Sequence, residues 1–297
     1  MKILIIGSKG FIGSHCVSYF SKKHEVVTCD VVVDYTATNY FLIDATNASF
    51  EGVFRSQLFD VCINCSGAAN VQDSIKNPQR DFLLNTHNVF KQLDAIRQYN
   101  PDCKYINLSS AAVYGNPQYL PIDEKHPLKP ISPYGYHKKM AEEICSEFYD
   151  SYGVATTSLR IFSAYGPGLK KQLFWDLYKK QALGKEVILY GTGNESRDFI
   201  YILDLVNAID LVIKKSTFTG TCINVANGVE HTIGAVTKLY FSLINTSISY
   251  DFGGEERKGD PINWVADVSL LKSFGYQPAT TLEEGFTKFI AWRKELK

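Results

Sequence analysis

Tyr134 and Lys138 are four residues apart in a Tyr-Gly-Tyr-His-Lys stretch with a helical pattern. Residues at this spacing stand one turn apart on the same face of a helix. A free phenol has a pKa of about 10 and is a poor base at neutral pH. An ammonium group one turn away favours the phenolate and lowers that pKa. The pair is therefore suited to take a proton from a hydroxyl group while hydride leaves the same carbon. Because Tyr-x-x-x-Lys also occurs by chance on surface helices, the interpretation depends on three further motifs.

The first motif is a glycine loop at the N-terminus. Residues 2–6 form a short apolar run typical of a buried parallel strand, and a helical pattern extends from Phe11 to about Phe20. Between them, the glycines permit a tight turn and let a pyrophosphate approach the backbone, and the helix start offers amide donors. The Gly-x-x-Gly-x-x-Gly spacing is one residue wider than the usual dinucleotide fingerprint. The residues predicted to bind the cofactor here are Gly7, Gly10, Phe11, Ile12 and Gly13.

The second motif is Asp30, which ends a predicted strand at residues 25–30. An acidic side chain about twenty residues beyond the glycines can accept hydrogen bonds from a ribose 2′-hydroxyl and would repel a 2′-phosphate. Lys9, inside the glycine loop, argues in the other direction, because a lysine there could pair with that phosphate. We weigh the carboxylate more heavily, so the predicted cofactor is NAD.

The third motif is a serine pair after the strand-like residues 104–106. A serine just past the carboxyl end of a strand sits where open α/β sheets bind ligands. Either Ser109 or Ser110 could hold the reacting oxygen beside Tyr134.

With these motifs in this order, the chain resembles the extended short-chain dehydrogenase/reductase family, which includes nucleotide-sugar epimerases and dehydratases. The resemblance implies an α/β fold: a Rossmann doubly wound parallel sheet with a smaller C-terminal α/β substrate-binding domain. Residues 1–163 would bind NAD, with a return of about residues 199–225 to that domain. Residues 164–297 would mainly bind the sugar nucleotide. The family also implies a homodimer, in which helices at about 74–99 and 134–152 pair with their copies.

The resemblance also assigns roles to individual residues. It makes Ser110, Tyr134 and Lys138 catalytic and the last two cofactor-binding as well. The further residues expected at the cofactor are Asp44, Ala45, Ser66, Gly67, Asn85 and Phe162, and those at the substrate are Ser110, Ser163, Arg197 and Arg257. Two positions depart from the family pattern: Ser163 replaces a usual Asn, and Asn64 replaces a usual His.

The residues after Ser110 bear on the type of reaction. The family's dehydratases place Asp and Glu there to eliminate water, whereas this chain has Ala111 and Ala112, which do no acid–base work. The expected reaction is C4 epimerisation of a nucleotide-diphosphate sugar through a transient 4-keto intermediate, in surface polysaccharide precursor synthesis. The alternatives are an NAD(P)H-dependent 4-ketoreductase of a 4-keto-6-deoxy nucleotide sugar and a non-catalytic dinucleotide-binding regulator.

Composition narrows the possible partners, cellular location and metal content of the protein. The 297 residues include 31 Lys plus Arg and 31 Asp plus Glu, and this neutral balance argues against nucleic acid as a partner. An apolar run of about eighteen residues is missing, so we expect no membrane span. A strand begins at once, so we expect no signal peptide and a cytoplasmic protein. The six histidines lack ligand spacing, and Cys62 and Cys65 share an apolar strand, so we expect no metal and buried, reduced thiols.

Overall fold

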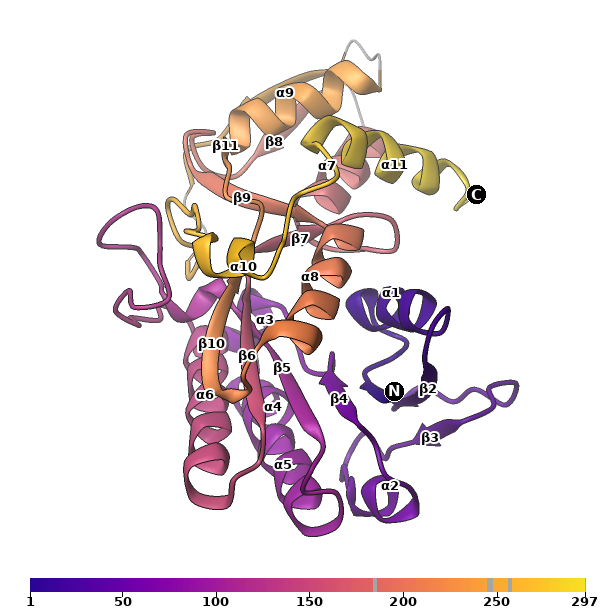
Figure 1. The fold of residues 1–297 in the computed structure, drawn as a ribbon. Helices are drawn as coiled ribbons and strands as arrows, with labels where there is room; N and C mark the ends of the chain where they lie inside the picture. Colours follow the sequence, from indigo (N-terminus) through magenta and orange to yellow (C-terminus); the bar gives the residue numbers. More distant parts are fainter. Residues whose placement is uncertain (184–185, 245–247, 256–257, 297) are drawn as a thin grey trace.

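The computed structural model describes residues 1–183, 186–244, 248–255 and 258–296, which form two parts (Figure 1). The larger part is a seven-stranded parallel sheet with helices on both faces. The smaller part, at the top of Figure 1, combines two short sheets with helices α7, α9 and α11. The predicted doubly wound α/β fold is therefore confirmed.

The large sheet has the strand order β10-β6-β5-β4-β1-β2-β3. β2 lies on one side of β1 and β4 on the other, so the order reverses beside β1. In open α/β sheets, ligands bind beyond the carboxyl ends of the strands at such a switch point. The strands are β1 (Lys2–Ile6), β2 (Glu25–Asp30), β3 (Tyr40–Leu42), β4 (Val61–Asn64), β5 (Lys104–Ser110), β6 (Thr156–Ile161) and β10 (Thr219–Val225).

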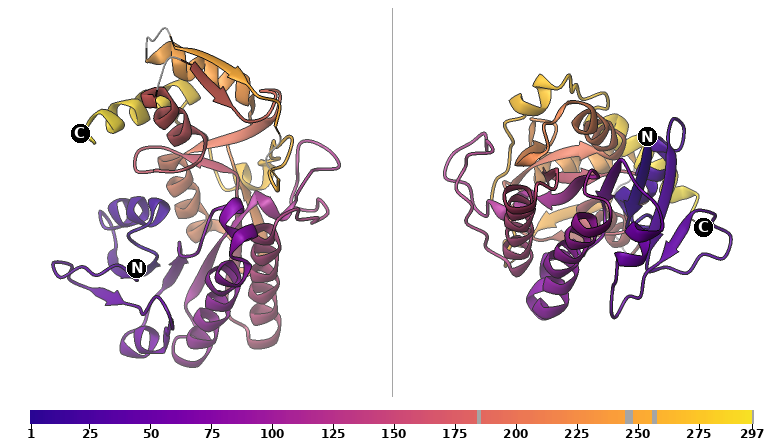
Figure 2. Two further views of the ribbon diagram at one scale, coloured as in Figure 1. Left: turned by 180° about the vertical axis from the view of Figure 1, so that it is seen from behind. Right: turned by 60° about the horizontal axis from the view of Figure 1, so that its bottom comes forward.

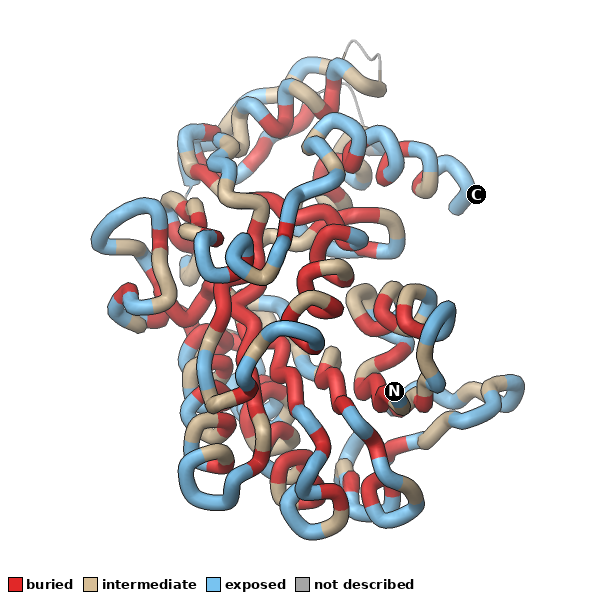
Figure 3. The backbone as a smooth tube through the Cα atoms, in the orientation of Figure 1, coloured by how far each residue is buried: buried red, intermediate tan, exposed pale blue. Residues whose placement is uncertain are grey.

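Alternate residues of the central strands face two different helix layers. In β1, Ile3 and Ile5 pack in the core that includes α1 and α8, whereas Leu4 and Ile6 pack in the core that includes α2, α5 and α6. This is the period of two of a strand buried on both faces, and Figure 3 shows the central strands as mostly buried. The helices of these layers are α1 (Phe11–Phe20), α2 (Glu51–Ser56), α5 (Asn88–Tyr99), α6 (Pro133–Tyr152) and α8 (Ile202–Lys215).

The prediction of one continuous helix from about Ser74 to Tyr99 is wrong. The segment consists of α3 (Val71–Lys76), α4 (Pro78–Phe82), a π-helical turn η1 (Leu83–His87) and α5. Pro78 lacks an amide hydrogen and disfavours helical geometry in the preceding residue, so α3 ends and α4 begins with proline in its first turn.

Two elements from the second half of the chain complete the large sheet. β10 pairs with β6 at the sheet edge, and α8 packs against α1. The Tyr19 hydroxyl donates to the Asp210 carboxylate at 3.0 Å across the α1–α8 contact. Figure 2 shows the same arrangement from behind.

The smaller part has an aromatic centre. Tyr165 stacks on Phe174 with ring centroids 4.7 Å apart, and Phe286 packs against both rings. No helix in the described ranges combines the length and apolar character that a membrane crossing needs. The elements are β7 (Ser163–Tyr165), α7 (Gln172–Leu183), β8 (Glu186–Leu189), β9 (Ser196–Tyr201), β11 (Glu230–Thr232), α9 (Ile233–Leu243), β12 (Ser249–Phe252), α10 (Ser269–Ser273) and α11 (Leu282–Lys294).

Candidate active site

The first turn of α6 carries Tyr134 against the end of β5. Ser132 caps the helix by accepting a hydrogen bond from the Gly135 amide at 3.2 Å, and Pro133 occupies the first turn. A β-carbon on Gly135 would lie 2.5 Å from the Ala112 carbonyl oxygen. The missing side chain therefore lets α6 approach η2 (Ala111–Val113), the turn that follows Ser110.

The structure separates the two candidate serines. The Ser110 oxygen accepts a hydrogen bond from the Ala112 amide at 3.2 Å, and its side chain lies close enough to the Tyr134 phenol to lower the pKa of that phenol. Ser109 points to the opposite face of the strand and donates to Glu142 at 2.5 Å. Ser110 is thus the serine that lies beside the tyrosine.

Lys138 lies one turn beyond the tyrosine, with its Nζ atom 5.9 Å from the Tyr134 ring centroid. Nζ donates to the Leu108 carbonyl oxygen at 2.8 Å, and burial lowers the pKa of Lys138 to about 8. Burial also raises the pKa of Tyr134 to about 12, against the opposing effect of the Ser110 hydrogen bond. The expectation that Lys138 would lower the phenol pKa is wrong for this structure, because desolvation of the phenolate is the largest influence on that pKa.

Sequence reasoning missed Asp81, a carboxylate only 2% exposed beneath this site. One oxygen accepts a hydrogen bond from the Asn85 amide at 3.0 Å, and the other lies 2.6 Å from His137 Nδ1. Its charge raises the pKa of Lys138 and so opposes the effect of burial there. The signal in the sequence was an acid one helical turn before Asn85.

The predicted glycine loop makes close backbone contact with the loop after β4. Gly7 has a φ of +78°, and a β-carbon on it would lie 2.6 Å from the Ser66 amide nitrogen. Asn64, the departure from the family pattern, holds that second loop because its Oδ1 accepts hydrogen bonds from the Ser66 amide at 3.1 Å and the Ser66 hydroxyl at 2.5 Å. The two loops thus meet at the switch point of the sheet.

A buried acceptor faces this region. Asn85 Oδ1 has no hydrogen-bond partner within the described residues, although its amide nitrogen donates to the Ala68 carbonyl at 3.0 Å. A β-carbon on Gly67, whose φ is +115°, would lie 2.5 Å from that oxygen. Buried acceptors are nearly always satisfied in native proteins. An orphaned acceptor beside bare glycine backbone therefore fits a bound dinucleotide that donates a hydrogen bond.

The two predicted cofactor carboxylates are held by backbone amides. Asp30 accepts hydrogen bonds from the Lys9 amide at 2.8 Å and the Val31 amide at 2.7 Å. Asp44, which precedes Ala45, accepts from the Thr46 amide and hydroxyl, both at 2.7 Å, and these bonds lower its pKa. Backbone amides thus fix both carboxylates near the carboxyl ends of β2 and β3.

Three further predicted site residues lie in or beside β7 and β9: Phe162, expected at the cofactor, and Ser163 and Arg197, expected at the substrate. Phe162, only 6% exposed, separates β6 from β7 and contacts the Trp264 ring edge-on at 6.0 Å, and Ser163 begins β7 half-buried. Arg197 donates to the Ile262 carbonyl at 3.1 Å and lies over the same Trp264 ring at 5.5 Å. Arg257 lies outside the described residues.

Asp198, next to Arg197, faces away from it. Its carboxylate accepts hydrogen bonds from the Asn227 and Gly228 amides, each at 2.9 Å, and burial raises its pKa to about 6. The two side chains alternate across β9, so Asp198 is committed to backbone donors rather than to the arginine.

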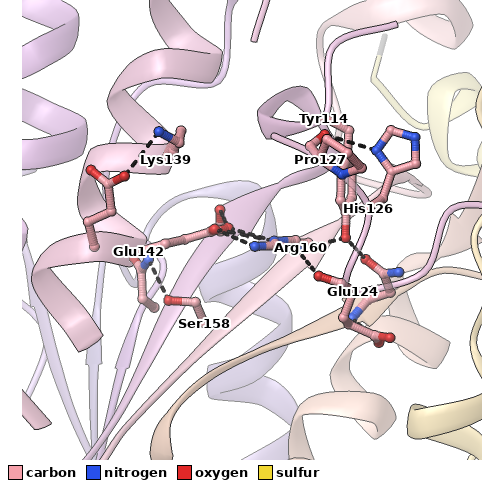
Figure 4. A network of polar contacts seen from close by, with 12 residues as sticks. Tyr114, Glu124, His126, Pro127, Lys139, Glu142, Ser158 and Arg160 are labelled. Atoms are coloured by element: carbon pink, nitrogen blue, oxygen red, sulfur yellow. Dashed lines mark hydrogen bonds and ion pairs between the residues drawn. The ribbon is translucent and has the colours of Figure 1, made fainter. Parts of the chain in front are cut away.

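A buried ion pair ties α6 to the sheet (Figure 4). Arg160 donates to Glu142 through Nε at 3.1 Å and Nη2 at 2.9 Å, and both side chains are about 5% exposed. Arg160 also donates to the Tyr114 hydroxyl at 2.9 Å, which in turn donates to Asn224 of β10 at 2.7 Å. The network thereby joins four segments of chain behind the Ser110–Tyr134 pair.

Comparison with known proteins decides the family. Residues 3–226 match the model of the NAD dependent epimerase/dehydratase family. The chain belongs to this family. The predictions of an enzyme and of NAD as its cofactor are confirmed by that membership.

Individual members of the epimerase/dehydratase family match the whole chain. An uncharacterized UDP-glucose epimerase of Bacillus subtilis is 30% identical, and the match covers 100% of this chain and 99% of the relative. A putative UDP-glucose 4-epimerase of Methanocaldococcus jannaschii is 28% identical over 98% of both chains. The solved structure of a UDP-N-acetylglucosamine 4-epimerase of Methanobrevibacter ruminantium, in complex with UDP-N-acetylmuramic acid, has a TM-score of 0.90 and 26% identity and covers 100% of this chain and 99% of its own.

Proposed function

We propose that this epimerase/dehydratase inverts the configuration at C4 of a UDP-sugar and supplies surface polysaccharide synthesis in the cytoplasm. One observation carries the proposal: Ser110, Tyr134 and Lys138 are brought together next to two alanines. The relatives named above carry the names of UDP-sugar epimerases, one of them putative and one uncharacterized, and this supports UDP as the nucleotide.

The reaction needs a proton carrier and a held oxygen. The glycine loop and Asn85 would hold NAD, which would supply the hydride acceptor and whose positively charged oxidised ring would favour a nearby phenolate. Tyr134 takes the C4 hydroxyl proton and returns it after the keto sugar has turned. Ser110, whose hydroxyl group lies beside the phenol, holds the reacting oxygen, and Lys138 lies one helical turn away with its Nζ atom 5.9 Å from the Tyr134 ring centroid.

The alanines argue against elimination. Ala111 is fully buried and Ala112 is 9% exposed, so neither position offers a group that could take a C5 proton or protonate a leaving hydroxyl. A 4-ketoreductase remains the second candidate, because it would use the same three residues with an exchangeable reduced cofactor.

The test is a substrate screen in which the product is read directly. Purified protein is incubated with UDP-, GDP-, CDP- and dTDP-sugars without added cofactor, and C4 configuration is followed by proton NMR. The expected result is interconversion, without added cofactor, of two UDP-sugars that differ only in their configuration at C4. Turnover that requires added NADH or NADPH and consumes it in stoichiometric amount would point to the ketoreductase instead.

Arg197→Ala is expected to weaken binding of the sugar nucleotide while leaving NAD binding within about twofold. The arginine offers charge-assisted hydrogen bonds to a diphosphate, worth about 1.5–3 kcal/mol, or roughly ten- to a hundredfold in Kd. Calorimetry with UDP and with NAD measures both constants. An unchanged Kd for UDP would mean that Arg197 contacts Ile262 and Trp264 but does not bind the diphosphate.

We also expect a homodimer formed through α4, η1, α5 and α6. Large apolar side chains on these elements are exposed by 38–51%: Phe82, Leu83, Phe90, Tyr136 and Met140. A two-fold interface needs such a self-complementary apolar face.

Light scattering at micromolar concentration tests this expectation. The expected mass is about twice the chain mass of 33.4 kDa. Phe90→Glu in the centre of this face is expected to return the mass to that of one chain, with Leu58→Glu, an exposed residue outside it, as the control. A wild-type mass of one chain would contradict the interface.

A further inference from the structure

Lys9 occupies the position in the glycine loop where a cation would help to bind NADP. Its amide donates a hydrogen bond to the Asp30 carboxylate at 2.8 Å. Lys9 therefore contacts the group that is expected to accept a hydrogen bond from the ribose 2′-hydroxyl. A 2′-phosphate would replace that hydroxyl, and a free ammonium on Lys9 would offset its charge. The sequence alone therefore leaves Lys9 as an argument for NADP.

The structure gives this ammonium another partner. Lys9 Nζ forms an ion pair with Asp34 Oδ2 and lies 5.4 Å from the Tyr40 ring centroid. The other oxygen of Asp34 accepts hydrogen bonds from the Thr36 amide at 2.9 Å, the Thr36 hydroxyl at 2.8 Å and the Ala37 amide at 3.1 Å. These bonds fix the carboxylate in the loop after β2 and leave Oδ2 for the lysine.

The local charge balance then favours the unphosphorylated ribose. The Lys9 ammonium and the Asp34 carboxylate neutralise each other, so the Asp30 charge remains uncompensated. The Lys9 bond, followed by the Thr36 bonds, holds the pKa of Asp34 well below its usual range, so the carboxylate stays ionised at neutral pH. A 2′-phosphate would meet the negative charge of Asp30 while the nearby cation is already paired.

We propose that Asp34 is a specificity-determining residue that keeps Lys9 away from the cofactor's 2′-position and so helps Asp30 to exclude NADP. The proposal rests on binding of the dinucleotide at the glycine loop. It assigns the preference for NAD to two carboxylates. Asp30 would accept hydrogen bonds from the ribose, and Asp34 pairs with the Lys9 ammonium, which could otherwise bind the 2′-phosphate.

The experiment measures dissociation constants of NAD and NADP by calorimetry on the full chain after removal of bound nucleotide. Asp34→Asn is expected to tighten NADP binding by roughly tenfold, the size of one new charge-assisted hydrogen bond, and to change NAD binding by less than about twofold. The double variant Asp34→Asn with Lys9→Gln is expected to return to the wild-type NADP affinity. Asp94→Asn, which removes an acid paired with Arg97 on α5, controls for the change in net charge.

Two results would overturn the proposal. One is an unchanged NADP affinity in Asp34→Asn, or a gain that persists in the double variant. The other comes from Lys9→Gln alone, which does not depend on the folding of the Asp34 variants. Because the ammonium is already paired, this variant should leave NADP affinity within about twofold, and a severalfold loss would show that Lys9 reaches the phosphate in the wild type. Failure of the wild type to bind NAD would instead count against the cofactor site itself.

Discussion

Tyr134→Phe should reduce C4 epimerisation by roughly 10²–10⁴-fold, the usual contribution of a general acid–base group. The phenol oxygen is the group that carries the proton, and the phenylalanine ring fills the same space without it. Because Tyr134 belongs to a buried apolar cluster that includes Ala226 and Trp264, the fold should survive the change. Steady-state rates with the UDP-sugar found in the screen measure the loss.

Retention of more than about a tenth of the wild-type rate would assign the proton to another group. Binding of NAD, measured by calorimetry, serves as the control and should change little. Tyr136→Phe offers a matched comparison two residues away on the same helix, because Tyr136 is 51% exposed. That variant should retain the wild-type rate.

Glu142→Ala should destabilise the protein by about 3–5 kcal/mol, because it leaves Arg160 as a buried charge without its carboxylate partner. The free energy of unfolding, measured by urea denaturation, tests this. The Glu142 oxygens also accept the Ser109 hydrogen bond, so their removal adds a second unsatisfied donor behind the active site.

The neighbouring residue provides the control. Glu143 forms an exposed ion pair with Lys139, and Glu143→Ala should change stability by no more than about 0.5 kcal/mol. The double variant Glu142→Met with Arg160→Met removes both charges together and should recover most of the lost stability. Equal losses for the two single glutamate variants would mean that the buried pair contributes little.

The sequence predicted those parts of the fold that depend on local pattern. The apolar run of β1, the glycines after it and Asp30 at the end of β2 each follow from composition and spacing within a few residues. The position of Ser110 at the end of β5 and of Tyr134 at the start of α6 was predictable for the same reason. The parallel sheet collects strand ends at one edge, and this places Ser110 where ligands bind in such folds.

What the sequence could not predict depends on contacts between distant residues. The pKa of Tyr134 is raised because many segments bury it, and burial does not appear in a Tyr-x-x-x-Lys spacing. Asp81 and His137 are 56 positions apart, so their pairing became visible only in three dimensions. Likewise, the ion pair between Lys9 and Asp34 is visible only in the structure, because the loop after β2 brings the two residues together.

The position of β10 has a consequence for how the molecule is made. β10 pairs with β6 at the edge of the sheet, and α8 covers α1. Both elements are synthesised only after residue 200. Until then, the emerging sheet has an unpaired edge at β6 and an apolar helix face without its cover, and such surfaces recruit chaperones or other chains. The larger part of the molecule is therefore completed by residues from the second half of the chain, and a chain cut at residue 163 should aggregate rather than fold as an independent domain.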